Sequence, residues 1–558
     1  MTKTQKNIFF CFLILLTFLI FFRLGRHDIL SDEGHYAFRS VKFFDYMASL
    51  GQTTPVQWFG DRPAWSFFGF HDHPALFFLI QHFSFSLFGD SVVASRLPSA
   101  LAAIGTALVV YFLAKRLRGI NAGIISLGAL ALNAYFIWMG RIGLIESTFI
   151  FFFLLGLLYL VKAQMVKEKY FVHAGLFFAL SFLTKYTFLF GLPGIILFMI
   201  WKARPMMKGK KFWLGILVFL IFSAPIFIYN TGMYLDRGHF DVQFSDLFKQ
   251  QHEDWTILSN RVNTSGFNPL AVVQVLVSGL SWPYFAVFIL GLFSSLYLAY
   301  KDRRQEVFLI GLVLLSFFFF LAVVGPAERW ITILSPFAAL FIGLGFEKLL
   351  PKRIIFFGGA VLVGIFSLFF VLNTNTFYKA RGDSFWYAPF RSENYGYNQL
   401  DKKIAMILDD KMTTNQLGSL TNSIWYYQIN PRALDFSELK QRGSPFNGAI
   451  VFDSSTSWFA TVWIFERRKF SQRFFMPTAE EFLKINSFPE IHERLRSLMP
   501  LEFYFIESGE TVKKYAADTQ FVESQQIVEL FTKEGIVPEI VRDNLGREAF
   551  YIYKGVLN

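Results

Sequence analysis

The chain contains repeated apolar runs close to the length of about 20 residues that a helix needs to cross a membrane, and short loops rich in Lys and Arg separate them. These runs predict a polytopic membrane protein. We expect eleven spans, at about residues 8–24, 93–114, 120–138, 147–163, 170–184, 188–201, 212–229, a stretch ending near 300, 307–324, 330–347 and 354–372. With this assignment every predicted inner loop is basic, as the positive-inside rule requires.

The apolar run Ala75–Phe88 is predicted to lie in the membrane interface. As a helix it reaches about 21 Å, short of a hydrocarbon core of about 30 Å, and polar residues such as Gln81 interrupt it. If it crossed the membrane, the basic loops at 115–118 and 202–211 would face outward. A second possible interfacial segment is 269–281.

Composition agrees with this class of protein. The chain is 54% hydrophobic and 17% charged. Its net charge of +12 comes from short loops between apolar runs, so it predicts contact with anionic lipid rather than nucleic acid. The single cysteine, Cys11, excludes an intramolecular disulfide and a cysteine-based metal cluster. We expect a multi-pass protein of the plasma (inner) membrane with a cytoplasmic N-terminus.

From about residue 375 the pattern becomes mixed and mostly soluble. Short β-rich runs at 448–452 and 501–506 alternate with helical candidates, which predicts an extracytoplasmic α/β domain. The predicted fold class is therefore a mainly α membrane protein with a C-terminal α/β domain. The predicted domains are 1–374, with outer loops 25–92 and 230–268, and 375–558.

This topology brings a set of ionisable residues to the outer membrane boundary. They are Asp32, Glu33, His71, His73, Arg96, Arg141, Glu146, Lys185, Glu328 and Arg329. Lys185 and Arg329 directly adjoin apolar runs, where a cation requires a counter-charge. That partner is either one of the carboxylates or a phosphate in the interface. The simpler alternative is that each long side chain extends separately to the interface.

The adjacent carboxylates Asp32 and Glu33 follow the first span almost immediately. One interpretation is a helix start, in which Ser31 or Asp32 caps a helix that begins at Glu33. The other is a general base, because a carboxylate beside a dry cavity can deprotonate an acceptor hydroxyl or amine. The two roles are compatible.

Histidines occur twice at spacings that resemble metal sites. His71-Asp72-His73 has ligand-like spacing, but paired histidines in loops are often simply exposed. The segment 252–254, His-Glu-Asp, is predicted to be a polar surface turn. We expect no metal ligands and no cofactor, although the acidic pair does not exclude a divalent metal.

The order of these motifs resembles the integral-membrane glycosyltransferases of the GT-C class, in particular the protein O-mannosyltransferase and aminoarabinose-transferase group. The motifs that carry the resemblance, spread over about residues 8–372, are Asp32-Glu33, His73-Pro74-Ala75-Leu76, Ser95–Ala100, Arg141–Glu146, Leu183-Thr184-Lys185 and Glu328–Ile331 leading to Ser335-Pro336. The chain departs from the family at Pro74-Ala75, where a double Pro is frequent, and at Glu146, where Asp is common.

The resemblance implies transfer of a monosaccharide from a polyprenyl-phosphate-linked donor to a protein, lipid or glycan acceptor on the outer face, with inversion. It makes Asp32 the base, with Glu33 as a supporting residue. Lys185, Arg329, Arg96, Arg141 and His73 would then bind the donor phosphate, and Glu146, Glu328 and His71 would support them.

Two other function classes fit parts of the sequence. A transporter or flippase of a lipid-linked or anionic solute would more often show paired repeats and charges at the membrane midplane. Here the ionisable residues gather at one boundary, and a long outer domain follows. A non-catalytic scaffold would leave those boundary charges unexplained.

Overall fold

The chain folds into two compact units in a computed structural model. The model describes residues 1–29, 32–47, 52–59, 61–255, 266–325, 327–347, 354–377, 388, 394–409, 448–453, 458–469, 476–484, 493, 496, 499–513 and 522–557. The helical unit comprises Met1–Leu24 and Pro63–Arg391, and the sheet unit comprises Gly25–Arg62 and Ser392–Asn558. The segment 25–62, predicted as an outer loop of the first domain, thus groups with the C-terminal residues. The predicted boundary at 374/375 stays a prediction.

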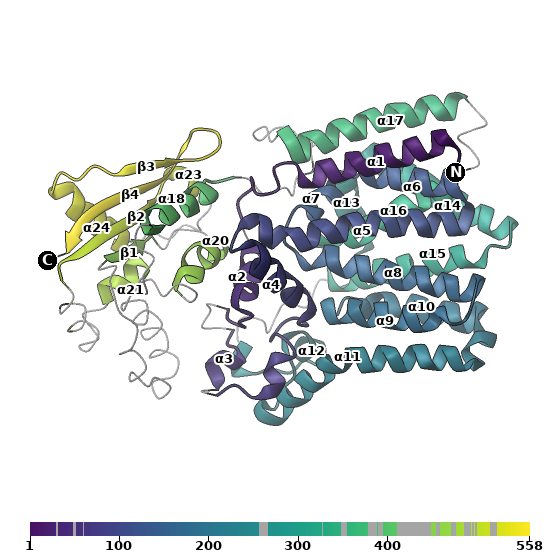
Figure 1. The fold of residues 1–558 in the computed structure, drawn as a ribbon, viewed down its shortest axis with the longest axis horizontal. Helices are drawn as coiled ribbons and strands as arrows, with labels where there is room; N and C mark the ends of the chain where they lie inside the picture. The colour runs from purple at the N-terminus through teal and green to yellow at the C-terminus, as the bar shows by residue number, and fades with distance from the viewer. Residues whose placement is uncertain are drawn as a thin grey trace. The chain divides into compact units, whose positions relative to one another are not determined.

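Long apolar helices run side by side in the helical unit (Figure 1). Seven stretches in the described part of the chain are long and apolar enough to span a membrane: α1 (Lys3–Phe21), α5 (Val92–Arg118), α8 (Ile145–Met165), α11 (Lys210–Arg237), α14 (Trp282–Lys301), α15 (Gln305–Val324) and Gly358–Thr376, which overlaps α17 (Ile354–Leu372). This confirms the predicted mainly α, multi-pass membrane architecture.

The third predicted span is broken in the structure. It forms α6 (Ile120–Ala131) and α7 (Ala134–Gly140), which meet at an angle of 72°. Asn133 begins α7 as its N-cap, because its side chain accepts a hydrogen bond from the Phe136 N–H. If the bent pair is one span, the described helices long enough to cross number eight.

Five apolar helices are shorter: α4 (Leu76–Phe88), α9 (Tyr170–Thr184), α10 (Phe188–Lys202), α13 (Pro269–Leu280) and α16 (Ile331–Phe346). The positions of α4 and α13 match the two predicted interfacial segments. The other three match predicted spans, and at about 1.5 Å per residue they reach only about 22–24 Å. Their buried faces pack against the long helices, α9 against both α8 and α11 and α10 against α15.

Glycine permits a close helix contact in this unit. A Cβ at Gly175 of α9 would lie 2.0 Å from the carbonyl oxygen of Gly215 in α11, so only glycine lets these backbones approach. Phenylalanines fill the wider spaces, as where Phe153 of α8 meets Phe317 of α15 edge-on, with ring centroids 5.1 Å apart.

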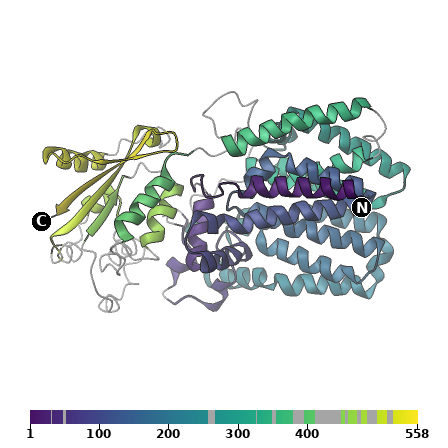
Figure 2. The same ribbon diagram turned by 45° about the horizontal axis from the view of Figure 1, so that its top comes forward.

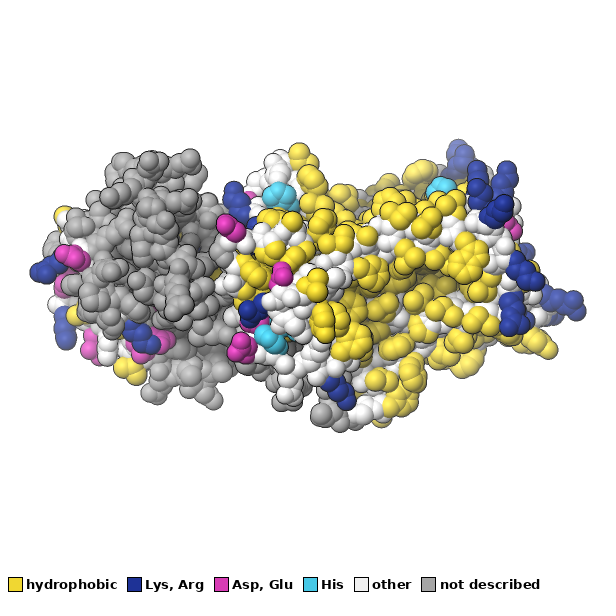
Figure 3. All heavy atoms as spheres, turned by 90° about the horizontal axis from the view of Figure 1, so that it is seen from below, with side chains coloured by type: hydrophobic (Ala, Val, Ile, Leu, Met, Phe, Trp, Pro, Cys, Tyr) yellow, Lys and Arg dark blue, Asp and Glu magenta, His cyan; other side chains and the backbone are white. Residues whose placement is uncertain are grey.

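The outside of the helical unit is apolar along its length and basic at one end. Figure 3 shows hydrophobic side chains covering the bundle and Lys and Arg side chains gathered at its end. Exposed apolar residues include Leu217, Phe293 and Leu315, and exposed basic residues include Lys202 and Lys301. Such a surface suits a bilayer with an anionic face at the basic end.

The sheet unit contains a mixed four-stranded sheet, which confirms the predicted α/β character of the C-terminal region (Figures 1 and 2). Its strands are β1 (Gly448–Phe452), β2 (Leu501–Ser508), β3 (Glu539–Arg542) and β4 (Glu548–Leu557), in the order β1-β2-β4-β3. The pairing of β1 with β2 is parallel, and both pairings of β4 are antiparallel. One core holds β2, β4 and the helix α24 (Val522–Lys533) together.

Asp28 explains why the segment after α1 belongs to the sheet unit. Its carboxylate accepts hydrogen bonds from the N–H groups of Tyr395, Gly396 and Asn398 at 2.6, 3.1 and 2.9 Å. These groups begin the helix α18 (Tyr397–Asp409), so a residue about 370 positions away caps that helix.

Candidate active site

A buried charged cluster joins three helix ends in the helical unit. Lys185 Nζ lies 2.5 Å from Glu146 Oε1, and Arg329 Nε lies 3.6 Å from the same oxygen. Glu146 is in the first turn of α8, Lys185 is the C-cap of α9, and Arg329 is in the short turn Glu328–Trp330 before α16. The structure therefore brings together three of the residues predicted for the site. It also supplies the carboxylate partner that Lys185 and Arg329 were expected to need.

Local hydrogen bonds hold the carboxylate in place. Ser147 Oγ donates to the carbonyl oxygen of Met139, and Ser99 Oγ donates to that of Leu144, so both fix the link between α7 and α8. Glu146 at the start of α8 also lies where the helix dipole favours a negative charge. Opposite it, the Lys185 ammonium lies 5.3 Å from the centre of the Trp330 ring, a cation–π contact.

Among the described side chains of the cluster, one carboxylate meets two cations. The side chain of Glu146 is 1% exposed and that of Lys185 9%, whereas that of Arg329 is 36% exposed and reaches the surface. As a set these three side chains carry one net positive charge, and Glu146 Oε2 has no hydrogen-bond partner among the described residues. Such an arrangement can hold an anionic group next to Arg329 and Lys185.

Arg96 and Arg141, both predicted as donor-binding residues, donate hydrogen bonds to backbone carbonyl groups. Arg141 donates to the carbonyl oxygens of Leu19, Ile20, Phe22 and Arg23, of which that of Phe22 is 2.7 Å away. Arg96 Nη1 donates to the Leu24 carbonyl oxygen at 2.8 Å. Because the last carbonyl groups of a helix lack partners within it, these two buried cations stabilise the end of α1.

His71, Asp72 and His73 form the tip of a tight turn. Phe70 and His73 exchange backbone hydrogen bonds, and Asp72 lies between the histidines, 3.1 Å from His73 Nδ1 and 3.9 Å from His71 Nδ1. His71 is buried, and its carbonyl oxygen accepts from the Val242 N–H at 2.8 Å. The turn therefore ties the first outer segment to the second.

A polar network beside Lys185 was not predicted from the sequence. The Tyr186 hydroxyl donates to the Asp241 carboxylate, and Asn230 Nδ2 donates to the same oxygen at 3.0 Å. Burial raises the pKa of the Asp241 carboxyl above its usual value, and burial followed by the nearby Asp241 charge raises the pKa of Tyr186 well above its own. Tyr186 thus keeps its proton and holds the segment after α11 against the Lys185 loop. The one sequence signal is that Asp241 is a good N-cap for α12 (Val242–Leu247).

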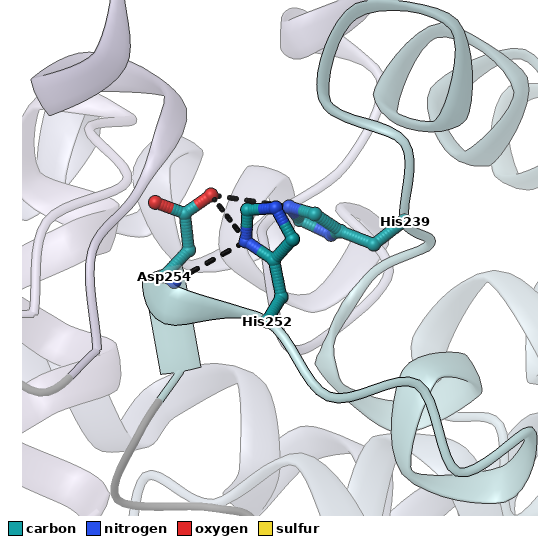
Figure 4. A group of neighbouring side chains, drawn as sticks. All are labelled: His239, His252 and Asp254. Atoms are coloured by element: carbon teal, nitrogen blue, oxygen red, sulfur yellow. Dashed lines mark hydrogen bonds and ion pairs between the residues drawn. The ribbon is translucent and has the colours of Figure 1, made fainter.

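A second unpredicted cluster follows in the same outer segment. His239, His252 and Asp254 direct ligand atoms at one another, all within 4.8 Å (Figure 4). The segment 252–254 was predicted to be a surface turn, but Asp254 is buried and His239 joins it from the end of α11. Among the described residues, these three side chains are the ones that could hold a metal ion.

The predicted catalytic pair lies in the sheet unit. Asp32 and Glu33 begin α2 (Asp32–Lys42), as the helix-start interpretation requires. Glu33 is buried at 2% exposure, and Asp32 is partly exposed. The helix packs against α20 (Trp458–Thr461) and η8 (Val462–Glu466). Ser31 and the side chain of Glu328 lie outside the described residues.

Comparison with known proteins identifies the fold. Residues 72–229 match the family model for dolichyl-phosphate-mannose-protein mannosyltransferase. The structure of ArnT from Cupriavidus metallidurans bound to undecaprenyl phosphate matches with a TM-score of 0.56 and 14% identity, covering 99% of this chain and 98% of ArnT. The chain has a GT-C fold. The apo state of ArnT matches almost equally well, with a TM-score of 0.55 and 13% identity over the same shares of both chains.

The likeness extends beyond the part that the family model covers. Because ArnT is matched over nearly its whole length, the similarity of fold includes the C-terminal sheet as well as the helices. An oligosaccharyltransferase from Archaeoglobus fulgidus matches at a TM-score of 0.49 and 13% identity, covering 91% of this chain and 70% of its own. No curated protein matches the chain by sequence.

Proposed function

We propose that this protein transfers a monosaccharide from a polyprenyl-phosphate-linked donor to an acceptor on the outer face of the membrane, with inversion at the anomeric carbon. The observation that carries the proposal is the cluster of Lys185, Arg329 and Glu146. Its two cations, at the ends of apolar helices, suit the phosphate of a lipid carrier. The likeness in fold to a protein whose structure holds undecaprenyl phosphate supports the same class of donor.

In this reaction Lys185 and Arg329 bind the leaving phosphate. The bond between the anomeric carbon and the phosphate oxygen breaks, and the phosphate gains negative charge as it leaves. Cations placed beforehand in a site of low dielectric stabilise that charge without reorganising. Glu146 has a positioning role, because its carboxylate holds both cations before the donor arrives.

We retain Asp32 as the proposed base. Its role is to accept the proton of the acceptor hydroxyl or amine while the new bond to the anomeric carbon forms. Glu33, the buried neighbour, is proposed to support it. Arg96 and Arg141 are now proposed to position the end of α1, since both donate to its carbonyl oxygens.

The decisive experiment supplies purified full-length protein with a panel of polyprenyl-phosphate sugars and follows donor consumption and release of polyprenyl phosphate. We expect one donor to be consumed, and Asp32→Asn to lower turnover by about 10²–10⁴-fold. Asp61→Asn is the matched control, because Asp61 is an exposed carboxylate of the same unit. Full activity of Asp32→Asn would remove Asp32 from the role of base.

If the protein is instead a flippase, the same purified protein would give a different result. Protein reconstituted in vesicles would move a labelled donor across the bilayer without consuming it. Movement of intact donor with no transfer to any acceptor in the panel would replace the proposed reaction.

A further inference from the structure

The cluster of His239, His252 and Asp254 is built from the end of α11 and the following outer segment. Gly238 ends α11 in the left-handed conformation, at φ 80°, and turns the chain so that His239 points back toward η3 (Glu253–Trp255). Asp254 Oδ2 lies 3.2 Å from His239 Nε2 and 3.0 Å from His252 Nδ1 (Figure 4). His239 and Asp254 are buried, and the side chain of His252 is 26% exposed.

The remaining contacts of the two imidazoles indicate which nitrogens carry protons. His239 Nδ1 lies 2.7 Å from the Phe240 carbonyl oxygen, which can only accept, so Nδ1 bears hydrogen and Nε2 is the nitrogen left to bind an ion. The backbone N–H of Asp254 lies 3.3 Å from His252 Nδ1, so this nitrogen carries a lone pair, and an ion would take that lone pair from the N–H. Each ring therefore places one nitrogen close to Asp254 Oδ2, where a shared cation could bind all three atoms.

The spacing suits a metal of the zinc type. Ligand atoms at about 2.0–2.2 Å from a tetrahedral ion lie about 3.4 Å from one another, close to the two nitrogen-to-oxygen distances here. A hydrogen bond from the second ring nitrogen to a carbonyl group, as His239 makes, is the usual support of a metal-binding histidine. Arg237 donates to both oxygens of Asp254, at 2.6, 2.8 and 3.1 Å, and orients the carboxylate. Its charge opposes a second cation, so the affinity has to come from the two imidazoles.

We propose that His239, His252 and Asp254 bind one divalent transition-metal ion, with zinc the best fit, and leave a fourth position open beside the partly exposed His252. The ion would join the end of α11 to η3. Asp241, two residues from His239, accepts hydrogen bonds from Tyr186 and Asn230, so the ion would also hold this segment where it meets the Lys185 loop. The proposal does not depend on the transferase reaction.

Metal binding by the tag-free full-length protein tests this directly. After chelator treatment and addition of zinc, we expect about one ion per chain. His239→Ala and His252→Ala should each weaken zinc binding at least about tenfold. His173→Ala is the matched control, because His173 is an exposed histidine on α9. Zinc binding by the wild type no stronger than by His239→Ala would overturn the proposal.

A cysteine variant keeps the test decisive if the alanine variants do not fold. His252→Cys should still bind metal, because a thiolate is a zinc ligand. With cobalt in place of zinc, this variant should gain a sulfur-to-cobalt charge-transfer absorption that the wild type and His173→Cys lack. Absence of that absorption in folded His252→Cys would overturn the assignment of residue 252 as a ligand.

Discussion

Two pairs of positively charged residues in the helical unit have different partners. Lys185 and Arg329 approach one carboxylate oxygen, whereas Arg96 and Arg141 donate to backbone carbonyl groups at the end of α1. A carboxylate leaves a pair of cations with one net charge, which can attract an anionic ligand. Carbonyl groups at a helix end use the directional hydrogen bonds of the guanidinium, and the cation then has a structural role. The partner of a cation, rather than its residue type, therefore distinguishes a ligand-binding role from a structural role.

Among variants of these basic residues and their neighbours, the largest effect is expected for Lys185→Met. We predict that kcat/KM for the donor falls about 10²–10³-fold, because the variant loses a buried cation beside the leaving phosphate. Lys162→Met is a matched control, since Lys162 makes a similar cation–π contact, 4.6 Å from the Tyr159 ring at the other end of α8.

A double variant separates phosphate binding from folding. Lys185→Met leaves Glu146 buried with only Arg329 beside it, and this costs stability. Adding Glu146→Gln removes that charge, so we expect thermal stability to recover while activity does not. Recovery of both would mean that Lys185 serves only to pair with Glu146.

Arg141→Met should affect stability rather than donor binding. Loss of a buried cation that serves several carbonyl groups is expected to lower the free energy of unfolding by about 2–4 kcal/mol. Unfolding in detergent measures this, and the donor KM of the folded fraction should match that of the wild type. If the free energy of unfolding is unchanged and the donor KM is raised, Arg141 binds the donor rather than supporting the end of α1.

Arg329→Ala is expected to weaken donor binding about tenfold, less than Lys185→Met, because Arg329 is partly exposed and solvent screens its charge. The measurement is the donor KM at low and high salt. The difference between wild type and variant should shrink as salt rises. A difference independent of salt would argue against a charge-to-phosphate contact.

The smallest effect is expected for Trp330→Leu. Removing the ring 5.3 Å from the Lys185 ammonium should weaken donor binding about two- to fivefold, the size of a cation–π contact of about 0.5–1 kcal/mol. Trp330→Phe should retain most of the affinity. A larger loss in the Phe variant would instead indicate that the indole contacts the donor itself.

Periodicity and charge predicted much of the fold. Each predicted span coincides with helical structure, and the β-rich runs at 448–452 and 501–506 became β1 and β2. The bend at Asn133 was missed, because the apolar pattern continues through it and one capping hydrogen bond decides the break. The grouping of 25–62 with the C-terminal residues depends on Asp28 meeting the start of α18, a contact between residues far apart in the chain.

The sequence predicted which residues belong to the candidate site, but not which of them contact one another. The sequence alone placed Lys185, Arg329 and Glu146 at one membrane boundary, because apolar length and loop charge follow from the cost of burying polar groups in lipid. Only the tertiary structure decided that these three share a cluster, that Arg96 and Arg141 serve the end of α1, and that His239 joins Asp254. Hydrophobic patterning is a property of neighbouring residues and can be read locally. Which cation meets which oxygen depends on how helices distant in the chain pack, and no local pattern records that.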